Sequence, residues 1–99
     1  MSNRIIICEA SEILTTGLYD ILQGIAGCDV VARIDTPEPI EEKIIACDAN
    51  LLIINPNLLG HTDRNLPSQL VKEHPQLCVI AFVTTYIESS LLKPYDAVI

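Results

Sequence analysis

Aromatic side chains are scarce in this chain of 99 residues, which has no tryptophan, one phenylalanine and three tyrosines. Hydrophobic residues still make up 49% of the sequence, so most of them are Ile, Leu, Val and Ala. Aliphatic residues of this kind are typical of parallel sheets whose two faces are covered by helices. The length corresponds to one small domain, and the apolar content is sufficient for a hydrophobic core.

Basic residues are also few, with six Lys and Arg against thirteen Asp and Glu and a formal net charge of −7. A protein that holds a nucleic acid needs clustered Lys and Arg side chains to neutralise the phosphates. We therefore expect this protein to contact DNA only through a domain that is not in this chain.

The sequence has neither a long apolar run nor a metal-binding cysteine spacing. No stretch reaches the roughly 18 apolar residues of a membrane helix, and the opening "MSNRIIICEAS" suits a first strand better than a signal peptide. The four cysteines, Cys8, Cys28, Cys47 and Cys78, lie in or beside apolar runs without C-x-x-C spacing. Buried, reduced thiols favour a cytoplasmic protein. From the cysteine spacing and the lack of a long apolar run we also expect no metal, no cofactor and no contact with a membrane.

Apolar runs alternate with amphipathic segments along the whole chain, which predicts one α/β domain over residues 1–99. The predicted strands are 4–8, 28–34, 50–55, 77–83 and 95–99. The predicted helices run from the cap Ser11 to Gly27, over 35–48 with Thr36 as the cap and Pro37 in the first turn, and over 65–75. Residues 56–64 are predicted as a loop, and 84–93 as a brief helix at best. Strands joined by helices in this way form a parallel sheet with right-handed crossovers.

The spacing of apolar residues also predicts which side chains face the core. The inward positions are Leu14, Leu18, Ile21, Leu22 and Ile25 in the first helix, Ile40, Ile44 and Ile45 in the second, and Leu66, Leu70 and Val71 in the third. The strand at 50–55 is the most apolar and is expected at the centre of the sheet. The ionic residues in the strand at 28–34 suggest an edge position.

Polar residues follow three of the predicted strands, where open parallel sheets collect their ligands. They are Glu9, next to Ala10, after the first strand, Asn55 and Asn57 after the third, and Thr84 after the fourth. Each also has a local interpretation. The Asn-Pro-Asn segment is typical of a turn, Glu9 of a first-turn acid, and Thr84 of a helix cap.

The order of these motifs resembles the receiver domain of bacterial two-component response regulators, especially those with a C-terminal helix-turn-helix. "IIICEASEILTTGL" is similar to the family's opening, where a strand runs into two acids and a helix. "DANLLIINPNLLG" resembles the stretch "D-x-D-L-(apolar)₃-D-x-x-M-P-G" around the phospho-accepting aspartate, and "VIAFVTTY" resembles the fourth strand with its hydroxyl residue. The resemblance covers essentially the whole chain. It implies a flavodoxin-like, doubly wound sheet in the order 2-1-3-4-5.

The resemblance implies a degenerate phosphorylation site. The acceptor position matches Asn55, an amide that cannot act as a carboxylate nucleophile. The two metal-binding acids match Glu9 and Ala10, so one carboxylate is missing, and Mg²⁺ prefers carboxylate oxygens. Thr84 matches the hydroxyl that contacts the phosphoryl group, and Asn57 matches a loop position whose carbonyl can serve a metal.

Two further family positions are less clear. Tyr86 matches the aromatic residue that switches position in receivers, although ordinary packing explains it equally well. The family's lysine after the fifth strand is either Lys93, in "LLKPY", or absent, because 95–99 is the better fifth strand.

These matches predict a non-enzymatic pseudo-receiver that works through protein–protein contacts, as a homodimer or with a partner, to control a DNA-binding output domain. A doubly wound sheet needs cover on both faces, yet no helix follows 95–99. We therefore expect the last helix to lie outside this chain, in a longer protein, unless a partner covers the gap.

An alternative from another class uses Cys8 as a nucleophile. The B component of sugar phosphotransferase systems has a similar size and a phosphocysteine at the end of its first strand. That family's loop contains glycine, whereas here the thiol is followed by Glu9, Ala10, Ser11 and Glu12. Acids beside a thiol raise its pKa, which opposes this function.

Overall fold

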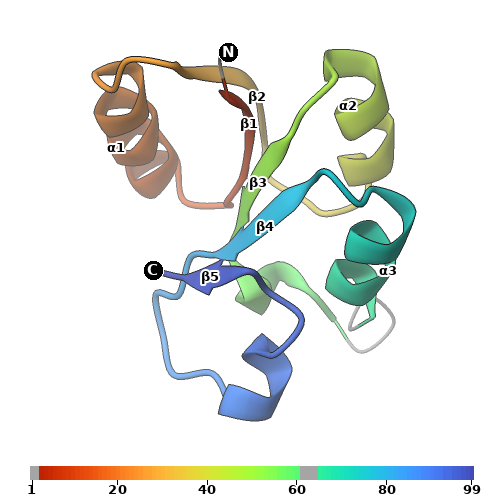
Figure 1. The fold of residues 1–99 in the computed structure, drawn as a ribbon. Helices are drawn as coiled ribbons and strands as arrows, with labels where there is room; N and C mark the ends of the chain where they lie inside the picture. Colours follow the sequence, from red (N-terminus) through yellow and green to blue (C-terminus); the bar gives the residue numbers. More distant parts are fainter. Residues whose placement is uncertain (1–2, 61–64) are drawn as a thin grey trace.

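The computed structural model describes residues 3–60 and 65–99 (Figure 1). The elements in chain order are β1 (Asn3–Cys8), α1 (Glu12–Gln23), β2 (Cys28–Ile34), α2 (Ile40–Cys47), β3 (Leu51–Ile54), the 3₁₀ helix η1 (Pro56–Leu58), α3 (Leu66–Glu73), β4 (Cys78–Ala81), the 3₁₀ helix η3 (Ser89–Leu92) and β5 (Ala97–Val98). All strand pairs are parallel, in the order β2-β1-β3-β4-β5. The predicted fold and strand order are confirmed.

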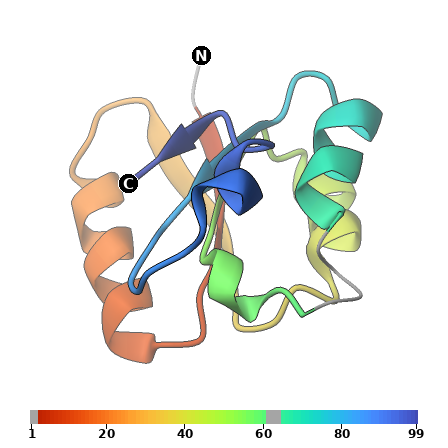
Figure 2. The same cartoon turned by 90° about the horizontal axis from the view of Figure 1, so that it is seen from below.

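The sheet separates two apolar layers. Figure 2 shows α1 on one side of the sheet and α2 and α3 on the other. Because alternate residues of a strand face opposite sides, Ile5 and Ile7 of β1 pack toward α1, whereas Ile6 and Cys8 pack in the larger cluster under α2 and α3. Residues 5 to 8 of β1 are fully buried, which explains their continuous apolar run.

The predicted positions of two strands are also confirmed. β3 lies at the centre, paired with β1 on one side and β4 on the other, and its Leu52, Ile53 and Ile54 are buried. β2 forms an edge, and its register with β1 shifts so that Val31 is skipped between Val30 and Ala32. Irregularities of this kind are common in edge strands.

The second helix begins later than predicted. α2 starts at Ile40, and the predicted cap Thr36 lies outside the helix. Proline disfavours helical backbone in the residue before it, so Pro37 and Pro39 exclude Thr36 and Glu38 from a regular helix. The chain forms a turn here instead, in which the Ile40 amide donates to the carbonyl of Pro37.

The first helix begins as predicted but ends earlier. The hydroxyl of Ser11 accepts a hydrogen bond from the Leu14 amide, as an N-cap does. The helix then stops at Gly24, and the predicted stop, Gly27, lies in the turn before β2 with a φ of 85°. Glycine adopts this left-handed conformation without strain.

For four side chains the prediction that they face the core is wrong. Ile21, Ile25, Ile45 and Val71 are exposed by 65%, 49%, 71% and 36%. A periodic pattern gives the direction of an apolar face but not the width of the surface that covers it. Here the sheet covers only a narrow stripe of each helix, so that Leu18, Leu22, Ile40, Ile44, Leu66 and Leu70 pack inward.

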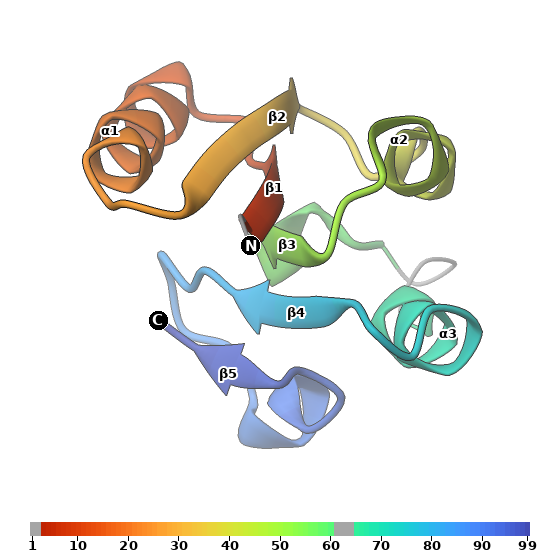
Figure 3. The ribbon, with the colours of Figure 1, turned by 45° about the horizontal axis from the view of Figure 1, so that its top comes forward.

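The segment between β4 and β5 contains the 3₁₀ helix η3 and no α-helix, as predicted. On the α1 side of the sheet, Figure 3 shows no described helix beside β4 and β5, and Ile80 and Phe82 are only partly buried there. Of the predicted loop over 56–64, residues 56–58 form η1 and 61–64 lie outside the described residues. No helix within residues 3–60 and 65–99 is long and apolar enough to cross a membrane.

Candidate functional site

Three polar side chains meet at the carboxyl edge of the sheet. The Nδ2 atom of Asn55 donates to Glu9 Oε2 at 2.7 Å and to Thr84 Oγ1 at 3.2 Å. β1, β3 and β4 are neighbours in register, with Cys8 beside Ile54 and Ile54 beside Ala81, so the residues that follow them emerge together. Parallel strands thus place side chains from three distant parts of the sequence in one cluster.

Glu9 is held on both of its carboxylate oxygens. Oε2 accepts from Asn55, and Oε1 accepts from the Ser11 amide at 3.1 Å. The carboxylate is 6% exposed and lies just before α1, where the helix dipole favours a negative charge. The Thr15 hydroxyl also donates to the Glu9 carbonyl at 3.2 Å, which fixes the backbone that carries the side chain.

Asn55 uses both ends of its amide. Its Oδ1 accepts from the Asn57 amide at 3.0 Å, and its Nδ2 donates to Glu9 and Thr84. The side chain is 5% exposed and caps η1, so the local interpretation of Asn-Pro-Asn as a turn is confirmed. The two bonds also fix the orientation of the amide, because only the nitrogen end can donate to a carboxylate.

A second hydrogen bond joins the same two loops. The Nδ2 of Asn57 donates to the Thr85 hydroxyl at 2.6 Å at the surface. No feature of the sequence distinguishes Thr85 from Thr84. The only signal was that both threonines follow β4, next to the strand that carries Asn55 and Asn57.

The other predicted site residues lie apart from this cluster. Ala10 is exposed and has no polar side chain to offer. Tyr86 is 89% exposed beyond β4. Lys93 precedes β5 and caps the end of η3, so it does not occupy the family's lysine position after the fifth strand.

The arrangement does not fit the magnesium ion that the family resemblance implies. Within the described residues, no group of three or more His, Cys, Asp or Glu side chains could hold a metal ion. Both oxygens of Glu9 are engaged, and the Nδ2 of Asn55 points donor hydrogens at the place where a cation would need oxygen ligands. The cluster can instead tie the segments after β1, β3 and β4 together.

The alternative that used Cys8 as a nucleophile is wrong. The Cys8 side chain is completely buried. Burial, followed by the nearby charges of Glu9 and Asp35, raises the pKa of its thiol to about 12. A nucleophilic cysteine needs a lowered pKa and access to its substrate, and Cys8 has neither.

The parallel sheet in the order β2-β1-β3-β4-β5, with helices on both faces, is a flavodoxin-like fold of the receiver type. Solved structures of the response regulator RcsB share this fold. Against the isolated receiver domain of RcsB from Salmonella enterica serovar Typhimurium with the phosphomimetic BeF₃⁻, the TM-score is 0.85 at 17% identity, covering 100% of this chain and 77% of that one. Against the non-phosphorylated receiver domain of Escherichia coli RcsB, the TM-score is 0.83 at 18% identity, covering 100% and 81%.

A structure of two RcsB dimers bound to two parallel DNAs also matches, with a TM-score of 0.87 at 18% identity. That match covers 100% of this chain and 56% of the RcsB chain, so this chain spans little more than half of that protein. No family model and no curated protein matches the sequence. At these identities the likeness establishes the fold.

Proposed function

We propose that this chain is a receiver-like signalling module that cannot be phosphorylated at the family's acceptor position and that acts through contacts with other proteins. The observation that carries the proposal is the hydrogen bond of 2.7 Å between Asn55 Nδ2 and Glu9 Oε2. The acceptor position holds an amide whose nitrogen is already bound to the acid that would otherwise help to hold a metal. A phosphoryl transfer at this place lacks both its nucleophile and its cation.

The same bonds support a role for the cluster in holding one conformation. Receivers and related switches change state when a charged group orders or releases a loop. Here Asn55 links Glu9 to Thr84, and Asn57 links its own loop to Thr85. The loops after β1, β3 and β4 are therefore tied to one another without a phosphoryl group.

The partner is proposed to be a protein, either a second copy or the output domain of a longer polypeptide. A net charge of −7 opposes direct contact with DNA. One RcsB structure that shares the fold contains two dimers bound to two DNAs, and the RcsB chain extends well beyond the matched region. By analogy, a DNA-binding function belongs to a domain other than this one.

Incubation with acetyl phosphate and Mg²⁺, followed by intact-mass measurement, tests the proposal. The receiver domain of RcsB, treated in parallel, controls for the activity of the reagent. We expect no phosphoryl adduct on this chain. A stable adduct that peptide mapping places at Asn55, or at the adjoining Glu9, would refute the proposed loss of acceptor chemistry.

A further inference from the structure

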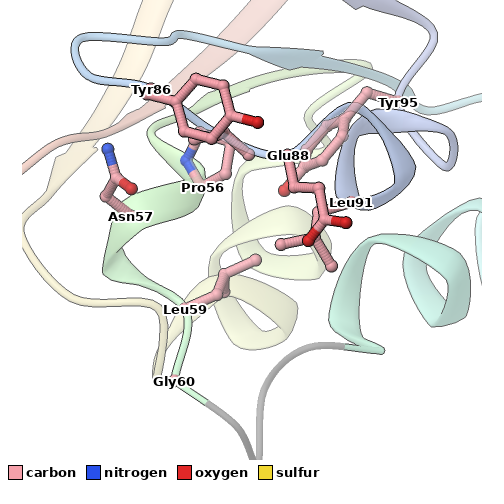
Figure 4. A pocket seen from close by; sticks show the side chains of 9 residues that line it. Pro56, Asn57, Leu59, Gly60, Tyr86, Glu88, Leu91 and Tyr95 are labelled. Carbon is pink, nitrogen blue, oxygen red and sulfur yellow. The ribbon is translucent and has the colours of Figure 1, made fainter.

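A small cavity lies beside the polar cluster, between η1 with its following loop and the connection from β4 to β5 (Figure 4). Its volume is about 200 Å³. Pro56, Leu59 and Leu91 supply an apolar wall, and Tyr86, Glu88 and Tyr95 supply polar groups. An apolar wall with a few converging polar groups is typical of ligand sites, and this volume suits a molecule smaller than a drug.

The hydroxyl of Tyr95 belongs to the lining of this cavity. Tyr95 is 9% exposed, and its ring belongs to the hydrophobic cluster under α2 and α3. Within residues 3–60 and 65–99 no hydrogen bond of its hydroxyl is found, and no fully buried side-chain nitrogen or oxygen there is left unsatisfied. Figure 4 shows the hydroxyl directed toward the cavity. A nearly buried hydroxyl normally has a hydrogen-bond partner, and a polar group bound in the cavity would supply one.

The electrostatics of the cavity favour a cation. Among the described residues that line it, Glu88 alone is charged, and the whole chain carries a net charge of −7. The exposed ring of Tyr86 also lines the cavity, and the face of an aromatic ring attracts an organic cation. An anion would meet a carboxylate and no described basic group there.

We propose that this cavity binds a small organic cation, namely an ammonium or guanidinium group on a short apolar stem. The Glu88 carboxylate and the Tyr95 hydroxyl accept hydrogen bonds from the cationic head, and the stem packs against Leu59 and Leu91. The ligand bridges the two segments that the bond between Asn57 and Thr85 already joins. This site is separate from the Glu9–Asn55–Thr84 cluster, so it does not depend on the proposed loss of phosphorylation.

A titration followed by NMR of the backbone amides tests the proposal, with benzylamine as the ammonium probe and agmatine as the guanidinium probe. We expect saturable shifts at Tyr86, Glu88 and Leu91. The dissociation constant should be on the order of 1 mM, which is an ordinary affinity for a ligand of about eight heavy atoms. Benzyl alcohol, which has the same shape without the charge, should bind about tenfold more weakly.

Three variants locate the site. Glu88→Gln should weaken benzylamine binding about fivefold, and Tyr95→Phe, which keeps the ring, should weaken it by a similar factor. Glu73→Gln removes an exposed acid from α3, outside the cavity, and should leave the affinity unchanged. The proposal is overturned by equal affinities for benzylamine and benzyl alcohol, by an equal loss in Glu73→Gln, or by no saturable shift up to roughly 50 mM probe.

Discussion

Replacing Asn55 by aspartate restores the acid of the receiver family and tests how the polar cluster is held. The substitution exchanges a donor 2.7 Å from Glu9 Oε2 for a second carboxylate of nearly the same shape. Both side chains are about 5% exposed, so water screens their repulsion poorly. The substitution should therefore destabilise the fold without creating a cavity.

The magnitude follows from two terms. The lost hydrogen bond to a charged acceptor contributes about 1.5–3 kcal/mol. Two like charges about 4 Å apart repel by about 4 kcal/mol at an effective dielectric constant of 20. Uptake of a proton by one carboxylate relieves part of this repulsion. We expect the free energy of unfolding of Asn55→Asp to fall by about 3 kcal/mol at pH 8.

The loss should depend on pH with a definite sign. Repulsion raises the pKa of the carboxylate pair in the folded variant above its value in the unfolded chain. The folded variant then binds protons more readily than the unfolded chain, so its stability deficit shrinks as the pH falls and grows as the pH rises. A cation that bridges both carboxylates should act in the same direction, so added Mg²⁺ should recover part of the loss at pH 8.

Urea denaturation of both proteins at pH 8 and pH 5, with and without Mg²⁺, measures these effects. Asn57→Asp is the matched control, because it adds the same charge two residues away at an exposed side chain. The control should lose less than about 1 kcal/mol. If Asn55→Asp were as stable as the wild type at pH 8 without Mg²⁺, the bond between Asn55 and Glu9 would not stabilise the folded protein.

Three further predictions concern other parts of the fold. Ser11→Ala removes the cap of α1 and should lower the free energy of unfolding by about 1 kcal/mol in urea denaturation, whereas no change would show that the cap is dispensable. Cys8 should resist iodoacetamide in the native protein at pH 8 and react once urea unfolds it, as peptide mapping can follow; rapid native labelling would contradict its burial. Burial raises the pKa of Cys8 from 9.0, and that of Tyr95 from 10.0, to about 12 in the folded protein. The stability that the neutral thiol and phenol groups contribute is thus complete below pH 9 and is lost toward pH 12. The urea midpoint should therefore decline over that range, and a constant midpoint would contradict the burial of the neutral groups.

The sequence predicts the sheet and the meeting of Glu9, Asn55 and Thr84 for the same reason. Parallel strands end at one edge, so the residues that follow neighbouring strands must converge once the strand order is known. The bond between Asn57 and Thr85 was not predictable in this way, because it depends on the shapes of two loops. Loop shape follows from local turns such as the cap that Asn55 forms on η1.

The errors in the helices have a different physical origin. The apolar patterns located each helix, but they could not show that Ile21 and Ile45 lie beyond the surface that the sheet covers. α2 begins later than predicted because the effect of proline on the preceding residue outweighs its preference for the first turn of a helix. The cavity lined by Tyr86, Glu88 and Tyr95 had no sequence pattern, because its walls come from segments without regular spacing.

Tyr95 belongs both to the hydrophobic cluster and to the cavity wall. Its ring rests among close-packed neighbours, which leave little room for a side chain to shift alone. A molecule that displaces the ring from outside must therefore rearrange residues that also support the sheet. Because the Tyr95 side chain forms part of both the cavity wall and the core, a change that moves its ring should alter the stability of the whole domain.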